Sequence, residues 1–301
     1  MGNSKMVRGY LFAIISAAIY GCMPMMAMYI YDDGVNPMTL VFLRNLLSLP
    51  VLALLGYLQS KTLKVPKQSL PSLSIIAIMG CCVTPILLFS SYNFIPSGTA
   101  TVFHFIYPAA VVVAGIIFLH KKAQIGYVIG VIICVAGVAL FYTPGSSPDI
   151  RGSLLALISG LTYAVYIILL SIFKYKQVTG FLFCFYISLI STIVMLAVCL
   201  ATGQMVFPSS AFGWILCIVF SIGITTGAVV LFQQSTFYIG GERTSILSTL
   251  EPTISIFIGV LIFHEYIGPR IFLGAALVIL ASILIALFDI KGQKKMHSQM
   301  E

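Results

Sequence analysis

The chain has 301 residues, of which 60% are hydrophobic and only 8% are charged, and its mean hydropathy is +1.09. A soluble globular protein carries about 25% charged residues, so 16 basic and 8 acidic side chains are too few to cover this surface. The apolar surface must therefore face lipid. The formal net charge of +8 does not indicate nucleic-acid binding, because the basic residues are scattered along the chain instead of gathered on one face.

Ten apolar runs follow one another along the chain, each near the length of about 20 residues that crosses a bilayer. They predict transmembrane helices over residues 9–30, 37–58, 71–92, 98–119, 124–142, 152–173, 179–201, 213–236, 243–264 and 270–289. Almost no sequence remains for a soluble domain. The function must therefore be performed within the bilayer or at its faces.

The basic residues indicate how these helices are oriented. With the N-terminus inside, the cytoplasmic segments carry 13 of the 16 Lys and Arg, as the positive-inside rule requires. The outer loops contain only Arg151 and Arg270, and Arg44 lies within the second predicted span. We therefore expect a multi-pass protein of the plasma (cell inner) membrane, with both termini inside.

The cysteines give no sign of a metal or redox centre. The chain has seven Cys, with no CxxC pair and no His at a metal-ligand spacing. We interpret them as small free hydrophobic residues and expect no metal and no cofactor.

An internal repeat links the two halves of the chain. RGYLFAIISAAIY, beginning at Arg8, aligns with RGSLLALISGLTY, beginning at Arg151, at a shift of 143 residues. Farther on, at a shift of 144, Pro108 aligns with Pro252 and His120 with His264. The units cover residues 8–142 and 151–289.

Each unit contains five predicted spans, and an odd number forces the second copy to enter the membrane from the opposite side. The expected fold is therefore an all-α membrane protein of ten transmembrane helices in two inverted five-helix repeats, N-in and C-in. Inverted repeats are typical of secondary transporters, which hold the substrate near the midplane and alternate access to it.

These features resemble the EamA family of the drug/metabolite transporter superfamily. The resemblance rests on the ten spans, the two five-helix units, and the central Pro of each unit's fourth helix, Pro108 and Pro252. The second unit has His264-Glu265, whereas the first departs from the family with His120-Lys121. The resemblance implies a transport fold but no particular substrate, because members are similar to exporters of amino acids, nucleobases, sugars and dyes.

Pro108 and Pro252 predict helix kinks. Each Pro removes the hydrogen bond to the carbonyl four residues earlier, which belongs to His104 in one repeat and Ser248 in the other. An unpaired carbonyl is costly in lipid, so we expect both kinks to face an interior cavity. In the alternative, a neighbouring helix satisfies the carbonyls.

Two charged residues lie deep in predicted spans, where charge is expensive and usually functional. Glu251 is the acidic one, and burial favours its protonated form in at least one state, as proton coupling requires. Arg44 lies seven residues into the second span and offers a planar fork for a substrate carboxylate. The alternative is a structural ion pair between the two.

Other polar and aromatic side chains share these helices. Tyrosines suit an amphipathic ligand, although helix packing explains them equally well, and amides in lipid need partners. The full set of candidate substrate-binding residues is Tyr20, Arg44, Asn93, His104, Tyr107, Tyr163, Tyr166, Gln233, Gln234, Ser248 and Glu251.

The function that we expect is secondary active transport of a small polar metabolite, such as an amino acid, with export and proton coupling as working hypotheses. The partners are then the small-molecule substrate and the lipid bilayer, with no nucleic acid, and the protein acts as a monomer or a homodimer. An enzyme is disfavoured because Glu251 has no acidic companion and His104 no partner at ligand spacing. A channel or a non-transporting scaffold is the other alternative; a channel would need charge rings or a carbonyl filter.

Overall fold

The computed structural model describes residues 3–95, 97–119, 125–140, 149–173, 178, 180–254, 269–270, 272–274, 276–277, 279–281 and 284. Over these residues the regular structure is entirely helical. The first half contains α1 (Asn3–Gly21), α2 (Met23–Asp32), α3 (Pro37–Leu46), α4 (Leu49–Ser60), η1 (Lys67–Ser69), α5 (Leu70–Ala77), η2 (Ile78–Val83), α6 (Thr84–Ser91), α7 (Ser97–His104), α8 (Tyr107–Leu119) and α9 (Ile125–Ala139). The second half contains α10 (Ile150–Ser171), α11 (Phe181–Thr202), α12 (Ala211–Phe220), η3 (Ser221–Ala228), α13 (Val229–Ile239) and α14 (Gly241–Leu247).

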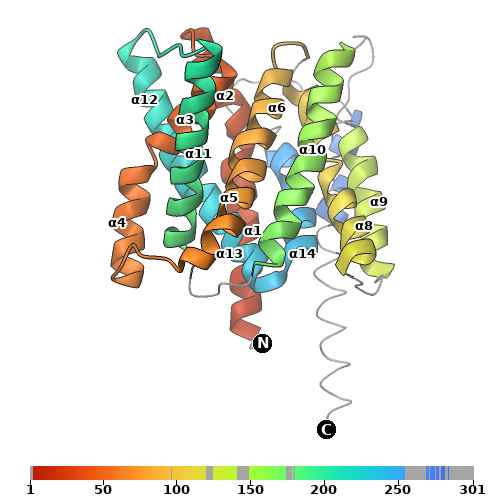
Figure 1. Cartoon of the computed structure of the whole chain (residues 1–301). Helices are drawn as coiled ribbons and strands as arrows, with labels where there is room; N and C mark the ends of the chain where they lie inside the picture. Colours follow the sequence, from red (N-terminus) through yellow and green to blue (C-terminus); the bar gives the residue numbers. More distant parts are fainter. Residues whose placement is uncertain are drawn as a thin grey trace.

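The helices stand side by side as a bundle (Figure 1). Six continuous or kinked helices in the described part of the chain are long and apolar enough to cross a membrane: Lys5–Asp32, Pro37–Ser60, Lys67–Ser91, Ile150–Ser171, Phe181–Thr202 and Ala211–Ile239. They correspond to the first three and to the sixth, seventh and eighth predicted spans. Shorter apolar helices, among them Tyr107–Leu119, lie within some of the remaining predicted spans.

Proline explains where several of these long helices break. Pro24, Pro50 and Pro85 each lie at the first or second position of α2, α4 and α6, directly after the preceding helical segment. A Pro has no N–H to donate to the previous turn but is tolerated at the start of a helix. Each long span therefore bends at its Pro without leaving the bundle.

Two π-helical segments, η2 and η3, interrupt the third and eighth predicted spans. A shift of 143 residues places Ile78 on Ser221, so the two segments begin at equivalent positions of the repeat. Hydroxyl groups bond to carbonyls within them: Thr84 Oγ1 donates to Met79 O at 2.8 Å, and Ser16 Oγ donates to Ala228 O at 2.8 Å. Wider turns of this kind are common at functional sites.

The helix packing pairs elements of one half with elements of the other. α1 packs on α13, and its repeat equivalent α10 packs on α6, the equivalent of α13. Likewise α1 contacts α14 while α10 contacts α7, and α3 and α4 pack on α11, their own equivalent. Each packing pair between the repeats therefore has a counterpart in which the first and the second repeat have changed places.

The helices α1 and α10 run in opposite directions. Gly9, near the start of α1, packs against the side chain of Ile239. Ser171, at the end of α10, packs against Gly241, two residues beyond Ile239. The start of one helix thus lies at the same end of the bundle as the end of the other.

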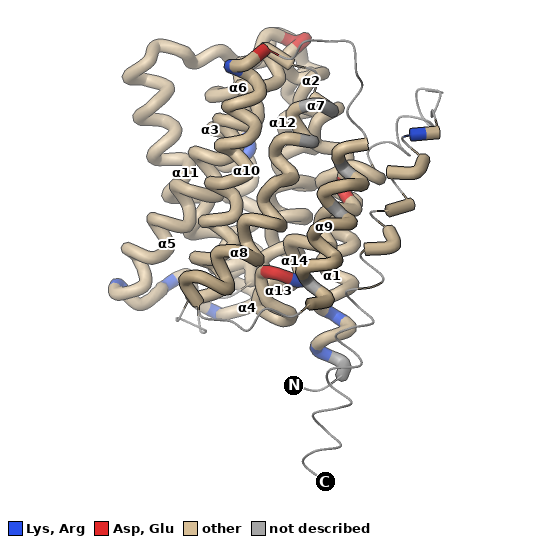
Figure 2. Tube along the Cα trace, turned by 90° about the vertical axis from the view of Figure 1, so that its right-hand side faces the viewer, with Lys and Arg blue, Asp and Glu red and all other residues tan. Residues whose placement is uncertain are grey.

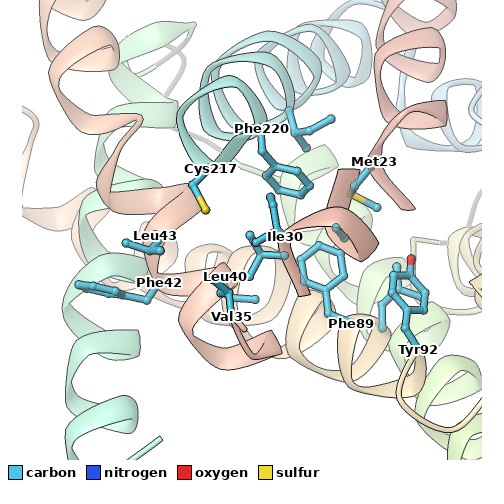
Figure 3. Close-up of a cluster of buried hydrophobic side chains, with 14 of the residues drawn as sticks. Met23, Ile30, Val35, Leu40, Phe42, Leu43, Phe89, Tyr92, Cys217 and Phe220 are labelled. Atoms are coloured by element: carbon cyan, nitrogen blue, oxygen red, sulfur yellow. The ribbon is translucent and has the colours of Figure 1, made fainter. Parts of the chain in front are cut away.

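An apolar cluster consolidates the half of the bundle around α2, α3, α6 and α12 (Figure 3). Phe89 and Phe220 are fully buried and their ring centroids lie 6.2 Å apart, edge to face. Ile30 and Leu40 are fully buried in the same cluster. This packing holds α6 against α12, which belongs to the other repeat.

A hydrogen-bonded clasp joins the loop after α2 to the loop before α12. The Asp33 carboxylate accepts from Ser209 Oγ at 3.0 Å and from Ser210 N at 3.2 Å. Nearby, Asn36 Nδ2 donates to Gln204 O at 2.7 Å. The hydrogen bonds, above all those from Ser210, hold the pKa of Asp33 below its ordinary value. The clasp therefore links the two repeats most firmly when Asp33 is ionised.

Basic side chains gather at one end of the bundle. Figure 2 shows most of the described Lys and Arg at the end where the N-terminus lies, whereas acidic residues lie both at the opposite end and beside α13 and α14. This is the distribution that the positive-inside rule associates with a cytoplasmic N-terminus.

Candidate functional site

A partly open cavity of about 50 Å³ lies among residues of both repeats. The first repeat supplies most of the wall, and the second supplies Tyr163 and Glu251. The lining residues are Tyr20, Met23, Arg44, Gly80, Thr84, Pro85, Leu88, Phe89, His104, Tyr163 and Glu251. Five of the predicted site residues therefore meet at one cavity: Tyr20, Arg44, His104, Tyr163 and Glu251.

Arg44 is buried near the end of α3, with 5% of its surface exposed. Its Nε donates to Thr225 Oγ1 at 3.2 Å, and its guanidinium carbon lies 6.0 Å from the ring centroid of Phe220. Its carbonyl oxygen accepts from Ser221 Oγ. The π-helical segment η3 of the second repeat thus holds both the side chain and the backbone of Arg44.

Glu251 faces Arg44 across the same cavity without pairing with it. Among the described residues no ion pair joins the two, so the structural ion pair considered above is not formed in this conformation. Tyr20 and Tyr163 line the same cavity as Glu251. The cavity is therefore lined by an arginine and a carboxyl group that do not pair with each other.

His104 occupies the end of α7, where it bonds to α10. Its Nδ1 lies 2.8 Å from Ser159 Oγ, and the Ser159 hydroxyl donates to Ala156 O at 2.6 Å. Because that hydroxyl has a single proton, it must accept from the imidazole. His104 therefore carries its proton on Nδ1, which leaves Nε2 as an acceptor.

Tyrosine rings continue the site beside His104. The ring centroid of Tyr163 lies 5.4 Å from that of His104, 4.9 Å from that of Tyr107 and 5.4 Å from that of Tyr166. Tyr107 and Tyr166 are buried behind Tyr163. The sequence placed these residues on two predicted spans, and the structure joins them in one aromatic cluster.

Gln233 supports this cluster from α13. Its Nε2 donates to the Tyr166 hydroxyl at 3.0 Å, and its Oε1 accepts from Cys184 Sγ at 2.7 Å. Both groups of the amide are thereby satisfied inside the bundle. Gln233 positions Tyr166 and does not line the cavity.

Both fourth helices break beside their Pro, but the two freed carbonyls differ. α7 ends at His104 and α8 begins at Tyr107, while α14 ends at Leu247 and helix resumes at residue 250. The Ser248 carbonyl accepts from Glu251 N at 3.0 Å, so the expectation of an unpaired carbonyl there is wrong. The tight turn before Pro252 satisfies it from within the chain. The His104 carbonyl packs closely against Gly160, where a Cβ would collide with it.

Three further predicted residues lie away from the cavity lining. Asn93 is exposed in the turn after α6. Gln234 is partly buried, and its Nε2 has no hydrogen-bond partner among the described residues. Ser248 is buried and its hydroxyl donates to Thr244 O at 2.9 Å. His120, His264 and Glu265 lie outside the described residues.

Gly80 and Thr225 were not predicted from the sequence. Gly80 lines the cavity within η2, and a Cβ there would overlap the ring of Tyr166. Thr225 orients Arg44 from η3. Nothing in the local sequence of either residue marks a π-helical turn, although the equivalent starts of η2 and η3 in the repeat are a signal that could have been followed.

A bundle of long apolar helices around a cavity lined by a buried arginine and a carboxyl group is typical of a multi-pass membrane transport protein. The comparisons with known proteins agree. The sequence model of the EamA-like transporter family matches twice, over residues 7–143 and 150–287. The chain belongs to this family, which is a member of the drug/metabolite transporter superfamily. Membership indicates a transporter and not an enzyme.

Individual relatives are distant. An "Uncharacterized transporter" of Clostridium kluyveri is 21% identical over 295 residues, which cover 93% of each chain. "Protein PagO" of Salmonella typhimurium is 27% identical over 139 residues, 45% of this chain and 46% of that one. A solved crystal structure superposes with a TM-score of 0.77 at 16% identity and covers 93% of this chain and 96% of its own. That likeness supports the fold alone.

Proposed function

We propose that this protein is a secondary active transporter that moves a small polar metabolite, such as an amino acid, by alternating access. The observation that carries the proposal is the cavity shared by the two repeats, which Arg44 and Glu251 both line. A substrate held between the repeats becomes accessible from either face as they rock against each other.

The proposed architecture is ten transmembrane helices in two inverted five-helix repeats, with both termini inside. The exchanged packing pairs, α1 on α13 and α10 on α6, support it. The opposite directions of α1 and α10 support the inversion. The gathering of basic residues at the N-terminal end supports the orientation.

The proposed substrate site is the cavity wall, with Tyr20, Arg44, His104, Tyr163 and Glu251 in contact with substrate. Tyr107, Tyr166 and Gln233 act behind them by fixing the rings. Asn93, Gln234 and Ser248 remain candidates only for a conformation in which the repeats have moved.

Glu251 is the proposed proton-coupling residue, and export is the proposed direction. Tyr20, Arg44, His104 and Tyr163 line the same cavity. A carboxyl in this position exchanges its proton when Arg44 or water approaches in only one state of the cycle.

Reconstituted vesicles test the proposal. Saturable counterflow of a labelled metabolite is expected, drawn from amino acids, nucleosides and sugars, and accumulation is expected to follow an imposed pH gradient. Glu251→Gln should abolish the response to the gradient while equilibrium exchange persists. Gradient-driven accumulation by Glu251→Gln at the parent level would refute the coupling role, and unsaturable flux would indicate a channel.

A further inference from the structure

The loop between α4 and α5 presents three lysines on the surface of the bundle, away from the cavity. They are Lys61, Lys64 and Lys67, and all three are exposed. Val65, which lies between them, packs against the buried apolar cluster that contains Phe183. Ser69 Oγ donates to the carbonyl oxygen of Pro66 at 2.7 Å. The loop is therefore fixed from inside, and its lysines are held outward.

No acidic side chain of the described part of the chain balances these lysines. The sequence contains no Asp or Glu at all between positions 34 and 148. Among the described residues, none of the three lysines takes part in an ion pair. The loop thus concentrates positive charge that an anion from outside the chain would neutralise.

The second repeat builds the same turn without charge. Its helix α11 ends in a left-handed residue, Gly203 at φ 65°, where the equivalent helix α4 ends in Lys61 at φ 56°. Glycine adopts this conformation freely, whereas a side chain is strained in it. Lys61 is the one described residue other than glycine with a positive φ. Residues 203–210, which match 60–67 at a shift of 143, contain no charged residue. A lysine held where the backbone favours glycine indicates a role for its side chain.

The exposed face of α4 leads directly to these lysines. Leu54 and Leu58 are four residues apart and share one face of the helix, and Tyr57 lies beside them. All three side chains are more than half exposed. An exposed apolar face on a membrane-spanning helix contacts lipid tails, and Tyr is typical of the level where the tails meet the headgroups. The lysines follow where this apolar face ends, at the level of the headgroups.

We propose that Lys61, Lys64 and Lys67 bind the phosphate headgroup of an anionic phospholipid whose acyl chains lie along the exposed face of α4. Lysine clusters directly beside a transmembrane helix attract anionic headgroups, and a phosphate oxygen accepts strong hydrogen bonds from ammonium groups. A free phosphate offers the same charge but no chain to cover Leu54 and Leu58. None of these residues lines the cavity, so the lipid site is separate from the proposed substrate site.

The same loop ties the first repeat to the second. Gln59 Oε1 accepts from Phe181 N at 3.1 Å, and the Tyr186 hydroxyl donates to the carbonyl oxygen of Leu63 at 2.8 Å. Phe181 and Tyr186 both belong to α11. A lipid that holds the loop in place therefore favours the packed state of the repeats and stabilises the folded protein by mass action.

Lipid titration of the full chain in a neutral detergent tests the inference. Native mass spectrometry measures the affinity for dioleoylphosphatidylglycerol and for the zwitterionic dioleoylphosphatidylcholine, and thermal unfolding measures the effect on stability. The anionic lipid should bind at least about tenfold more tightly and raise the unfolding midpoint, because each lysine near an anionic surface contributes about fivefold to affinity. Inorganic phosphate should give no comparable rise. A photoactivatable phosphatidylglycerol should label α4.

A matched pair of charge variants locates the site. The triple variant Lys61→Gln, Lys64→Gln, Lys67→Gln should bind phosphatidylglycerol at least about tenfold more weakly than the parent protein. The double variant Lys5→Gln, Arg8→Gln removes exposed basic residues from the start of α1 and should keep the parent affinity. An equal loss in the two variants would show attraction to basic charge in general and overturn the site.

Two substitutions at Lys61 separate its charge from the backbone strain. Lys61→Gly removes both, whereas Lys61→Ala removes the charge and keeps the strain. In neutral detergent without lipid, Lys61→Gly should therefore unfold at a higher temperature than Lys61→Ala. Both variants should lose about fivefold in affinity for phosphatidylglycerol. Undiminished affinity in both would overturn the role of Lys61.

The parent protein decides the question even if a variant misfolds. Equal affinity for the two lipids, or photolabelling that misses α4, would overturn the proposal. Stabilisation by inorganic phosphate or by poly-L-glutamate as large as that by phosphatidylglycerol would also overturn it, because a free anion or an acidic protein would then be the occupant. None of these readouts depends on transport, so a failure of saturable counterflow would refute the proposed function and leave the lipid site standing.

Discussion

His104 Nδ1 and Ser159 Oγ lie 2.8 Å apart and join α7 of the first repeat to α10 of the second. Both residues are buried, and the hydroxyl is committed as a donor to Ala156 O. The interaction therefore fixes the ring of His104 and the position of its proton at the edge of the cavity.

Ser159→Ala should destabilise the protein, because it leaves the Nδ1–H of His104 buried without an acceptor. We expect a loss of about 1–2 kcal/mol, in the range for hydrogen bonds inside membrane proteins, and weaker substrate binding as the ring reorients. Unfolding in detergent and counterflow affinity measure the two effects. Ser153→Ala is the matched control on α10, since the Ser153 hydroxyl has no partner among the described residues; equal losses in the two variants would contradict the role of His104.

Gly80→Ala should impair transport, whereas Gly223→Ala should not. A Cβ at Gly80 would overlap the ring of Tyr166, while none of the described atoms lies within 4 Å of a Cβ at its repeat equivalent Gly223. Overpacking costs about 1–3 kcal/mol and would displace Tyr166 from Gln233. Thermal unfolding and counterflow of both variants test this, and a similar defect in Gly223→Ala would attribute the effect to the π-helical turn itself instead of to Tyr166.

The clasp at Asp33 should weaken in acid. Its pKa is lowered in the folded protein by the hydrogen bonds from Ser210 and Ser209. The stabilisation is therefore complete above the ordinary Asp value of about 4 and is lost as the pH falls through the lower folded value. The unfolding midpoint of the parent protein should fall in that acid range, and Asp33→Asn should flatten this dependence. Asp32→Asn, at an exposed neighbour, should leave it unchanged; an identical acid response in Asp33→Asn would show that the clasp does not contribute.

The proposed orientation places Lys64 inside and Asp32 outside. A cysteine at position 64 should react with a membrane-impermeant maleimide only in inside-out vesicles, and a cysteine at position 32 only in right-side-out vesicles. The parent protein is the control for its native thiols, of which Cys81, Cys82, Cys184, Cys199 and Cys217 are buried. Reversed labelling would overturn the N-in assignment.

The sequence by itself determined the class of this protein and its internal repeat. Apolar runs long enough to cross a bilayer have no other stable environment, and matching residues in the two halves, such as Arg8 with Arg151 and Pro108 with Pro252, report a duplicated unit regardless of its packing. The isolation of Arg44 and Glu251 in apolar runs also marked both as functional candidates, because the cost of a charge in lipid depends on its depth in the span.

Only the tertiary structure decided which of the predicted site residues lie together at the cavity. The sequence treated Asn93 and Tyr163 alike, yet one is exposed in a turn and the other lines the cavity. Two further features depend on contacts between distant helices: Thr225 holding Arg44 and the ring of Tyr166 filling the space at Gly80. Hydropathy records how deep a residue lies in a span but not which face of its helix meets another helix, because that face is chosen by packing between segments far apart in the chain.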